Sequence, residues 1–140
     1  MARILIVDDD NVVRKSVHRM LERAGHEVWE SSRPKTALHM LDAVSVDVVI
    51  TDIYMPGMNG IELIRRLETR KSCRRVIAMT GGGTTRGSAE LLAEARSIGA
   101  DRTLEKPFGP AALLSAVDDV LALDAAAAPI TLTTRKVPDA

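Results

Sequence analysis

The chain has 140 residues, a length typical of one domain with a sizeable core. Its 19 lysines and arginines balance 19 aspartates and glutamates, which argues against the strong positive charge of proteins that bind nucleic acids or membrane surfaces. The single cysteine, Cys73, cannot form an internal disulfide, so the sequence gives no sign of an oxidising compartment.

Strand-like and helix-like segments alternate from the N-terminus. The apolar run Ile4–Val7 is too short for a signal peptide or a membrane span, so it predicts a strand in a cytoplasmic protein without membrane insertion. Apolar residues then recur at helical spacing from Val13 to Ala24, and Gly25 ends the helix. The same pattern repeats four times, with strands expected at 27–31, 46–51, 75–80 and 101–104 and helices at 35–44, 61–68, 88–99 and 109–123.

The expected strands read as unbroken apolar runs, which are typical of strands buried on both faces. Short strands that alternate with longer helices indicate parallel pairing through right-handed crossovers. Five such units are too few for a closed barrel, so the sequence predicts an α/β fold with an open, doubly wound, five-stranded parallel sheet. Ligands of such sheets bind beyond the carboxyl ends of the strands.

The C-terminal segment differs in composition from the rest of the chain. We expect residues 1–124 to form the single domain. Residues 125–140 contain two prolines and no sustained period, and they predict a disordered tail. The segment ITLT at 130–133 has residues of high β-propensity, which leaves open an added edge strand or a partner contact.

Polar side chains gather at the expected strand ends. Asp8 and Asp9 follow the first strand, Asp52 the third, Thr80 the fourth and Lys106 the fifth. Each alone has a structural explanation as a helix cap, a turn residue or a surface charge. Together they suggest a site, because clustered carboxylates repel one another unless a metal or a lysine offsets their charge. Oxygen ligands suit Mg²⁺, and a carboxylate, a cation, an amine and a hydroxyl are the groups that phosphoryl transfer needs.

The segments ILIVDDDNVVR, VDVVITDIYMPGMNGIELI, VIAMTG and LEKPF, in this order and spacing, resemble the receiver domain of two-component response regulators. The resemblance runs from about Arg3 to Leu123 and is closest in kind to the stand-alone chemotaxis regulators. It implies a flavodoxin-like sheet of order 2-1-3-4-5 with five helices. It also implies a phosphoacceptor that catalyses its own phosphorylation and dephosphorylation, and not a conventional enzyme.

The resemblance implies a role for each acid at the strand ends. Asp52 would become the 4-aspartylphosphate. Asp9 and Asp52, with the backbone carbonyl of Tyr54, would bind Mg²⁺, and Asp8 would hold a metal-bound water. Mg²⁺ is therefore the expected cofactor.

The remaining family positions include two matches and two departures. Lys106, followed by a cis Pro107, would pair with a phosphoryl oxygen, and Thr80 would turn its hydroxyl toward the modified aspartate. Thr103 stands where the family often carries an aromatic switch residue, which puts the usual Thr80–aromatic coupling in doubt. The glycine-rich segment Thr80–Ser88 is longer than the usual connection, and we expect it to move on phosphorylation.

The leading interpretation is a stand-alone response regulator. Asp52 would accept the phosphoryl group from a histidine kinase or a phosphotransfer protein. The modified chain would then contact an unidentified downstream protein, or pass the group on in a phosphorelay, without binding DNA directly. We expect partner contacts at the first helix and on the face formed by the fourth helix, the fifth strand and the fifth helix.

Two alternatives stay open. The chain can be a receiver fragment of a larger regulator or hybrid kinase. It can also be a phosphatase of the haloacid dehalogenase type that uses Asp52 as its nucleophile. The second alternative is weakened because Tyr54 occupies the place of the second aspartate of that motif.

Overall fold

The computed structural model describes residues 1–55, 59–70, 73–81, 88–97 and 99–132, and for residues 88–92 and 124–132 it describes the backbone alone. Within these residues five strands and five helices alternate: β1 Arg3–Val7, α1 Asn11–Arg23, β2 Glu27–Ser31, α2 Pro34–Ala43, β3 Val46–Asp52, α3 Gly60–Leu67, β4 Cys73–Thr80, α4 Ser88–Ser97, β5 Arg102–Glu105 and α5 Pro110–Leu132. None of the helices in this described part has the length and apolar character needed to cross a membrane.

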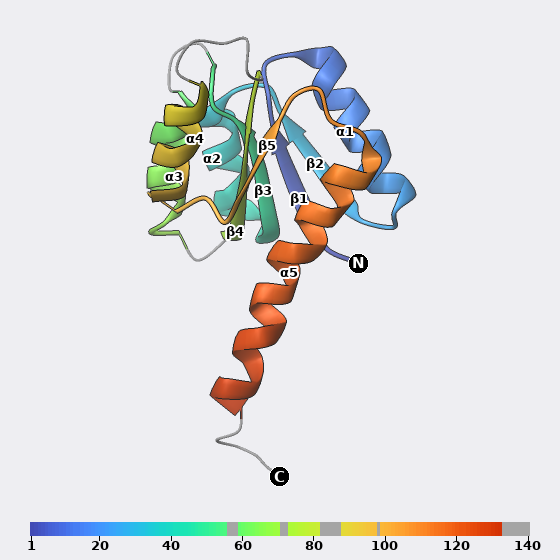
Figure 1. Cartoon of the computed structure of the whole chain (residues 1–140), viewed down its shortest axis with the longest axis vertical. Coiled ribbons are helices and arrows are strands. Elements are labelled where there is room, and N and C mark those ends of the chain that lie inside the picture. The colour runs from blue at the N-terminus through green and yellow to red at the C-terminus, as the bar shows by residue number, and fades with distance from the viewer. Residues whose placement is uncertain (56–58, 71–72, 82–87, 98, 133–140) are drawn as a thin grey trace.

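The five strands form one sheet in the order β2-β1-β3-β4-β5, and every neighbouring pair is parallel (Figure 1). This is the predicted fold class and strand order, so both expectations are confirmed. The central strand is β3, flanked by β1 and β4, and Val7 of β1 pairs with Thr51 of β3, so both strands end at the same edge of the sheet. The strand order reverses between β1 and β3, and such a reversal opens a crevice at the carboxyl ends of the strands.

Alternate side chains of each strand enter two separate cores. Leu5 and Val7 pack in a core that contains residues of α2, α3 and α4. Ile4 and Ile6 pack in a second core with residues of α1 and α5. Figure 1 shows these two helix layers on opposite faces of the sheet. Burial on both faces explains why the strands read as unbroken apolar runs.

Residues that are typical of helix ends lie at both ends of α1. The side chain of Asp10 accepts hydrogen bonds from the backbone N–H groups of Val12 and Val13, so Asp10 is the N-cap. At the other end Gly25 has a φ of +91°, a conformation that residues with a side chain rarely adopt. The predicted glycine stop is therefore confirmed.

The structure differs from the expected disorder at 125–132. The last helix, α5, continues through these residues to Leu132 and extends beyond the body of the domain (Figure 1). Four consecutive alanines at 125–128 account for the difference, because alanine has the highest helix propensity. The edge-strand alternative fails for residues 130–132, which are helical, and residues 133–140 lie outside the described residues.

The start of α3 lies directly against the end of β3. The N–H of Gly60 donates a hydrogen bond to the carbonyl oxygen of Ile53 at 2.7 Å. A Cβ atom at position 60 would lie 2.1 Å from the carbonyl oxygen of Asp52 and 2.6 Å from the Cα of Ile53. Both obstacles are backbone atoms, so they cannot rotate away. This close approach requires glycine, and it sets the distance between α3 and the strand end.

We therefore expect Gly60→Ala to lower the free energy of unfolding by about 3 kcal/mol, because the helix start must move away from the strand end. Urea denaturation would measure the change. Gly109→Ala is the matched control, since a Cβ at Gly109 meets nothing within 4 Å, and its effect should stay within about 0.5 kcal/mol. Equal effects of the two substitutions would contradict the interpretation.

Candidate functional site

Asp52 lies at the carboxyl end of a central strand. The preceding residues of β3, Val48 to Ile50, are fully buried and hold the strand between the two cores. Beyond the strand, the N–H of Ile53 donates to the carbonyl oxygen of Met79 at 2.9 Å, so the chain after Asp52 stays beside β4. Asp52 itself is 6% exposed. The fold thus places one carboxyl group at the rim of the core with little access to water.

Two further carboxylates come from the turn between β1 and α1. Asp8 is fully buried, and its N–H donates to the carbonyl oxygen of Ser31 at 3.1 Å. Asp9 is exposed. Carboxylate oxygens of Asp8, Asp9 and Asp52 all lie within 4.8 Å of one another. The predicted convergence of these acids at one edge of the sheet is present in the structure.

A lysine supplies the positive charge. The Nζ atom of Lys106 lies 2.8 Å from Oδ2 of Asp8 and 3.4 Å from Oδ2 of Asp52. The Lys106–Pro107 peptide is cis, as the resemblance implied. Burial opposes the charged form of Lys106, but the hydrogen bond to Asp8 and the charge of Asp52 outweigh burial and raise its pKa. Lys106 is therefore charged over the physiological pH range.

The environment of Asp52 raises the pKa of its carboxyl group. Burial raises its pKa to about 6 from the ordinary value of 3.8; the Lys106 ammonium opposes this rise, and the charge of Asp8 adds to it. A hydrogen bond from the backbone of Tyr54 also favours the charged form. Near neutral pH Asp52 is mostly ionised, yet it lacks the hydration of a surface carboxylate.

The fourth strand brings a hydroxyl to the same edge. Thr80 is fully buried, and its Oγ1 atom finds no hydrogen-bond partner among the described residues. Its carbonyl oxygen accepts a hydrogen bond from the N–H of Lys106 at 2.8 Å, which ties the ends of β4 and β5 together. A buried hydroxyl without a partner is costly, and this one is available to an additional acceptor.

Two departures from the family pattern can be located. Thr103 pairs with Ala78 in the sheet, and its Oγ1 lies 3.4 Å from an Nη atom of Arg96 on α4. A polar contact between α4 and β5 thus occupies the position of the aromatic switch. Residues 82–87 of the glycine-rich segment lie outside the described residues, so its expected movement stays a prediction.

Sequence reasoning missed Arg14 and Glu30. Arg14 is 8% exposed, and its Nη1 donates to the carbonyl oxygen of Asp8 at 2.8 Å. Its Nε donates to Glu30 on β2 at 2.8 Å. The available signal was spacing, because Arg14 lies three and seven residues before Val17 and Leu21, on the buried face of α1. A charge on that face indicates a buried partner.

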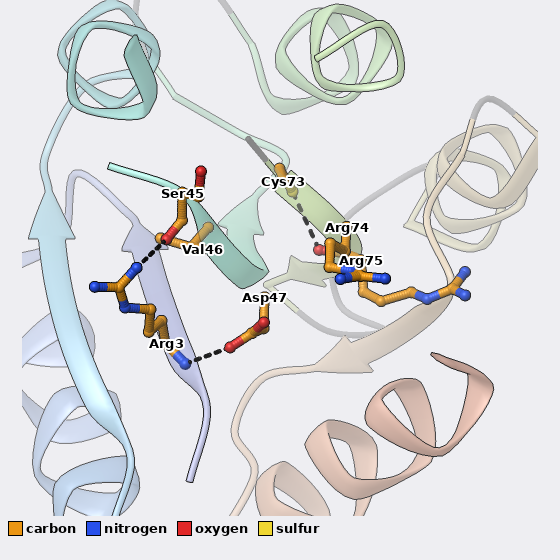
Figure 2. A pocket seen from close by; sticks show the side chains of 7 residues that line it. All are labelled: Arg3, Ser45, Val46, Asp47, Cys73, Arg74 and Arg75. Carbon is orange, nitrogen blue, oxygen red and sulfur yellow. Dashed lines mark hydrogen bonds between the residues drawn. The ribbon is translucent and has the colours of Figure 1, made fainter. Parts of the chain in front are cut away.

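A pocket of about 590 Å³ lies at the opposite end of the sheet, where β1, β3 and β4 begin (Figure 2). Arg3 lies on one side and Arg74 and Arg75 on the other, so the guanidinium groups do not converge. Burial raises the pKa of the Cys73 thiol in this pocket to about 12, which makes it a poor nucleophile. The candidate reactive groups therefore lie at the end of the sheet that carries Asp52.

Comparisons with known proteins agree with this geometry. A family model described as the response regulator receiver domain matches residues 4–118. Transcriptional regulatory protein FixJ of Azorhizobium caulinodans is 40% identical over 115 residues, which cover 80% of this chain and 51% of FixJ. Sporulation initiation phosphotransferase F of Bacillus subtilis is 30% identical over 121 residues, which cover 86% of this chain and 94% of that protein.

A solved structure gives the same result. The structure of chemotaxis response regulator CheY4 of Vibrio cholerae superposes with a TM-score of 0.76 at 31% identity, covering 86% of this chain and 98% of CheY4. The chain thus spans about half the length of FixJ and nearly all of the other two proteins.

The raised pKa of Asp52 leads to a stability prediction. In metal-free protein at about pH 7.5, Asp52→Asn should raise the free energy of unfolding by about 1–3 kcal/mol, because ionisation of Asp52 is less favourable in the folded state than in the unfolded state. Below the unfolded-state pKa of 3.8 the carboxyl is protonated in both states, so the gain should vanish there, grow as the pH rises from 3.8 to about 6, and stay constant at higher pH.

Urea denaturation across this pH range would measure the gain. Asp42→Asn is a suitable control, because the Asp42 side chain is 61% exposed and far less desolvated. A gain from Asp52→Asn that does not change with pH would contradict the assigned cause.

Proposed function

The chain belongs to the response regulator receiver family of two-component systems, and on this premise we propose that Asp52 accepts a phosphoryl group from a histidine kinase or a phosphotransfer protein. The observation that carries the proposal is the placement of the Asp52 carboxylate. It is nearly buried, lies 3.4 Å from Lys106 and shares its site with two other carboxylates. We place this reaction in the cytoplasm.

The transfer is an in-line displacement at phosphorus. A carboxylate oxygen of Asp52 attacks the phosphorus of a phosphohistidine, the P–N bond breaks, and its electron pair leaves with the imidazole, which takes up a proton. Limited hydration leaves the Asp52 carboxylate as a nucleophile that needs little desolvation before attack. The product is an aspartyl phosphate that carries the signal.

Lys106 and Thr80 would bind the transferred group. Lys106 already holds its ammonium against Asp52, so it can bond an equatorial phosphoryl oxygen with a small movement. The Thr80 hydroxyl is buried at the same edge, and none of the described residues forms a hydrogen bond with it. A phosphoryl group adds a charge of about −2 and strong acceptor oxygens, which gives the hydroxyl its partner.

The site also fits a magnesium ion. Three carboxylates within 4.8 Å of one another provide hard oxygen ligands, and one lysine leaves their combined charge only partly offset. We propose that Asp9 and Asp52 bind the ion directly with the carbonyl of Tyr54, and that Asp8 holds a water bound to it. When bound, Mg²⁺ neutralises the charge on the oxygens of the reacting phosphoryl group.

A groove beside the site suits the phosphoryl donor. It has a volume of about 250 Å³ and is lined by α1 and the segment after β5, namely Val12, Val13, Ser16, Val17, Met20, Lys106, Pro107 and Phe108. Val12 is 79% exposed at its mouth, although large apolar side chains are usually buried. Because Lys106 lines the groove and contacts Asp52, a protein docked there would hold its histidine close to the acceptor.

We assign the contact with a downstream protein to the face of α4, β5 and α5. Arg96, Thr103 and Arg102 lie on this face, and Arg102 pairs with Asp119 of α5 at 3.6 Å. The names of the relatives include a transcriptional regulator and a phosphotransferase, so the kind of output differs among similar proteins. Direct signalling to a protein partner and transfer in a phosphorelay both fit this proposal.

Phosphorylation at Asp52 can be tested directly. After incubation with acetyl phosphate and Mg²⁺, intact-protein mass spectrometry should show one added phosphoryl group that Asp52→Asn abolishes and Asp42→Asn keeps. Persistence of the adduct in the Asp52→Asn protein would defeat the assignment. Steady turnover of a generic phosphate ester without an accumulating adduct would instead support the phosphatase alternative.

If the groove beside the site binds the phosphoryl donor, a substitution in it should change the rate of transfer from a protein donor but not from a small molecule. Val12→Glu should slow transfer from a phosphorylated histidine kinase or phosphotransfer protein by about tenfold, because it places a charge on an apolar contact surface. Phosphorylation by acetyl phosphate should stay unchanged. Leu123→Glu, a charge at another exposed apolar position, is the control. An equal loss with both donors, or none with the protein donor, would contradict the assigned surface.

A further inference from the structure

The helix α1 buries a charged side chain on its apolar face. Arg14 is 8% exposed and shares this face with Val17 and Leu21, which are 1% and 0% exposed. Burial of a guanidinium group is unfavourable unless its N–H groups find acceptors. The contacts of Arg14 therefore show what its burial stabilises.

All three nitrogens of the Arg14 guanidinium donate hydrogen bonds. Nε donates to Oε1 of Glu30 at 2.8 Å, and Nη2 donates to Oδ1 of Asn11 at 2.5 Å. Nη1 donates to the backbone carbonyl oxygen of Asp8 at 2.8 Å. One planar group thus joins β2, the start of α1 and the turn that carries the acids of the candidate site.

The anchor of this arrangement is Glu30 on β2. Its side chain is 14% exposed and accepts hydrogen bonds from Arg14 and Lys15 and contacts His18. Burial alone would raise the pKa of Glu30, but the hydrogen bonds from Arg14, His18 and Lys15 lower it overall. Glu30 is therefore a fixed negative charge that holds the guanidinium in place.

The carbonyl that Arg14 binds belongs to the peptide unit between Asp8 and Asp9. On the other side of Asp8, its N–H donates to the carbonyl oxygen of Ser31 at 3.1 Å. The backbone is therefore held on both sides of Asp8, and the orientation of the peptide that leads into Asp9 is set by Arg14. The side chain of Asp8 is held separately, by Lys106 and by the N–H of Asp10 at 2.8 and 2.9 Å.

We propose that Arg14, anchored by Glu30, is a positioning residue that orients the Asp8–Asp9 peptide so that the Asp9 carboxylate can join Asp52 in binding a divalent cation. This inference rests on the proposed function, because it assigns Arg14 a task in that site. Arg14 does not touch the reacting atoms. Its effect passes through one backbone carbonyl, which is how groups outside the ligand set tune metal affinity.

The test compares Arg14→Lys with Lys15→Met. Lysine keeps the positive charge but lacks the planar fork, so it cannot bond Glu30 and the Asp8 carbonyl together. We expect Arg14→Lys to raise the dissociation constant for Mg²⁺, measured by isothermal titration calorimetry, by about tenfold. Lys15→Met removes a second cation from the same carboxylate, on a side chain that is 60% exposed, and should leave the constant within about twofold.

A second variant and two further measurements separate positioning from general stability. Glu30→Gln removes the negative charge of the anchor but keeps Arg14, and it should also weaken Mg²⁺ binding. In metal-free Arg14→Lys protein, the Asp8 amide should exchange with solvent faster than in the wild type. The rate of phosphorylation by acetyl phosphate should return to the wild-type value at saturating Mg²⁺, because positioning acts on metal affinity.

Several outcomes would overturn the inference. An unchanged Mg²⁺ dissociation constant in Arg14→Lys and Glu30→Gln would show that the cluster stabilises the fold alone, even if the melting temperature falls. A lower phosphorylation rate at saturating Mg²⁺ with unchanged affinity would also overturn the inference, because Arg14 would then act on the transfer step and not on metal binding. If the wild-type protein itself binds no Mg²⁺ and forms no adduct, the proposed function fails first, which distinguishes the two failures.

Discussion

The central constraint in this protein is the repulsion among three carboxylates that the fold places within 4.8 Å of one another. One lysine limits this repulsion, since the ammonium of Lys106 lies between Asp8 and Asp52. The compensation is incomplete, and the pKa of Asp52 stays near 6 because burial outweighs the attraction. The cluster thus lowers the free energy of unfolding of the protein. The same excess of buried negative charge would favour the binding of a cation, or the transfer of a phosphoryl group, at this place.

The sheet is what makes this concentration of charge possible. Parallel strands all end at one edge, so residues distant in the sequence arrive there without long loops. Gly60 brings α3 against the carbonyl of Asp52, and the N–H of Lys106 binds the carbonyl of Thr80, so α3 is held against the end of β3 and the end of β5 against β4. The charged groups are therefore positioned by backbone contacts, and their side chains need little freedom.

Much of the fold and the site could be predicted from the sequence, for identifiable reasons. Unbroken apolar runs indicated buried parallel strands, and the acids and the hydroxyl followed such runs, whereas Lys106 follows the more polar strand RTLE. Arg14 could not be found in this way, because a search for apolar spacing passes over a charge on the buried face. Its partner Glu30 lies on another element, and only tertiary packing brings the two together. The prolines among residues 125–140 predict disorder, but the four alanines at 125–128 favour the helix that the structure contains through Leu132.

The ion pair between Lys106 and Asp8 joins residues 98 positions apart, and this separation bears on how the protein is made. Synthesis proceeds from the N-terminus, so β1, β3 and all three acids leave the ribosome well before the lysine does. Until β5 emerges, the nascent chain holds an acidic cluster without its cation and a sheet without its last strand. The site around Asp52 can therefore gain its lysine only after translation has passed Lys106.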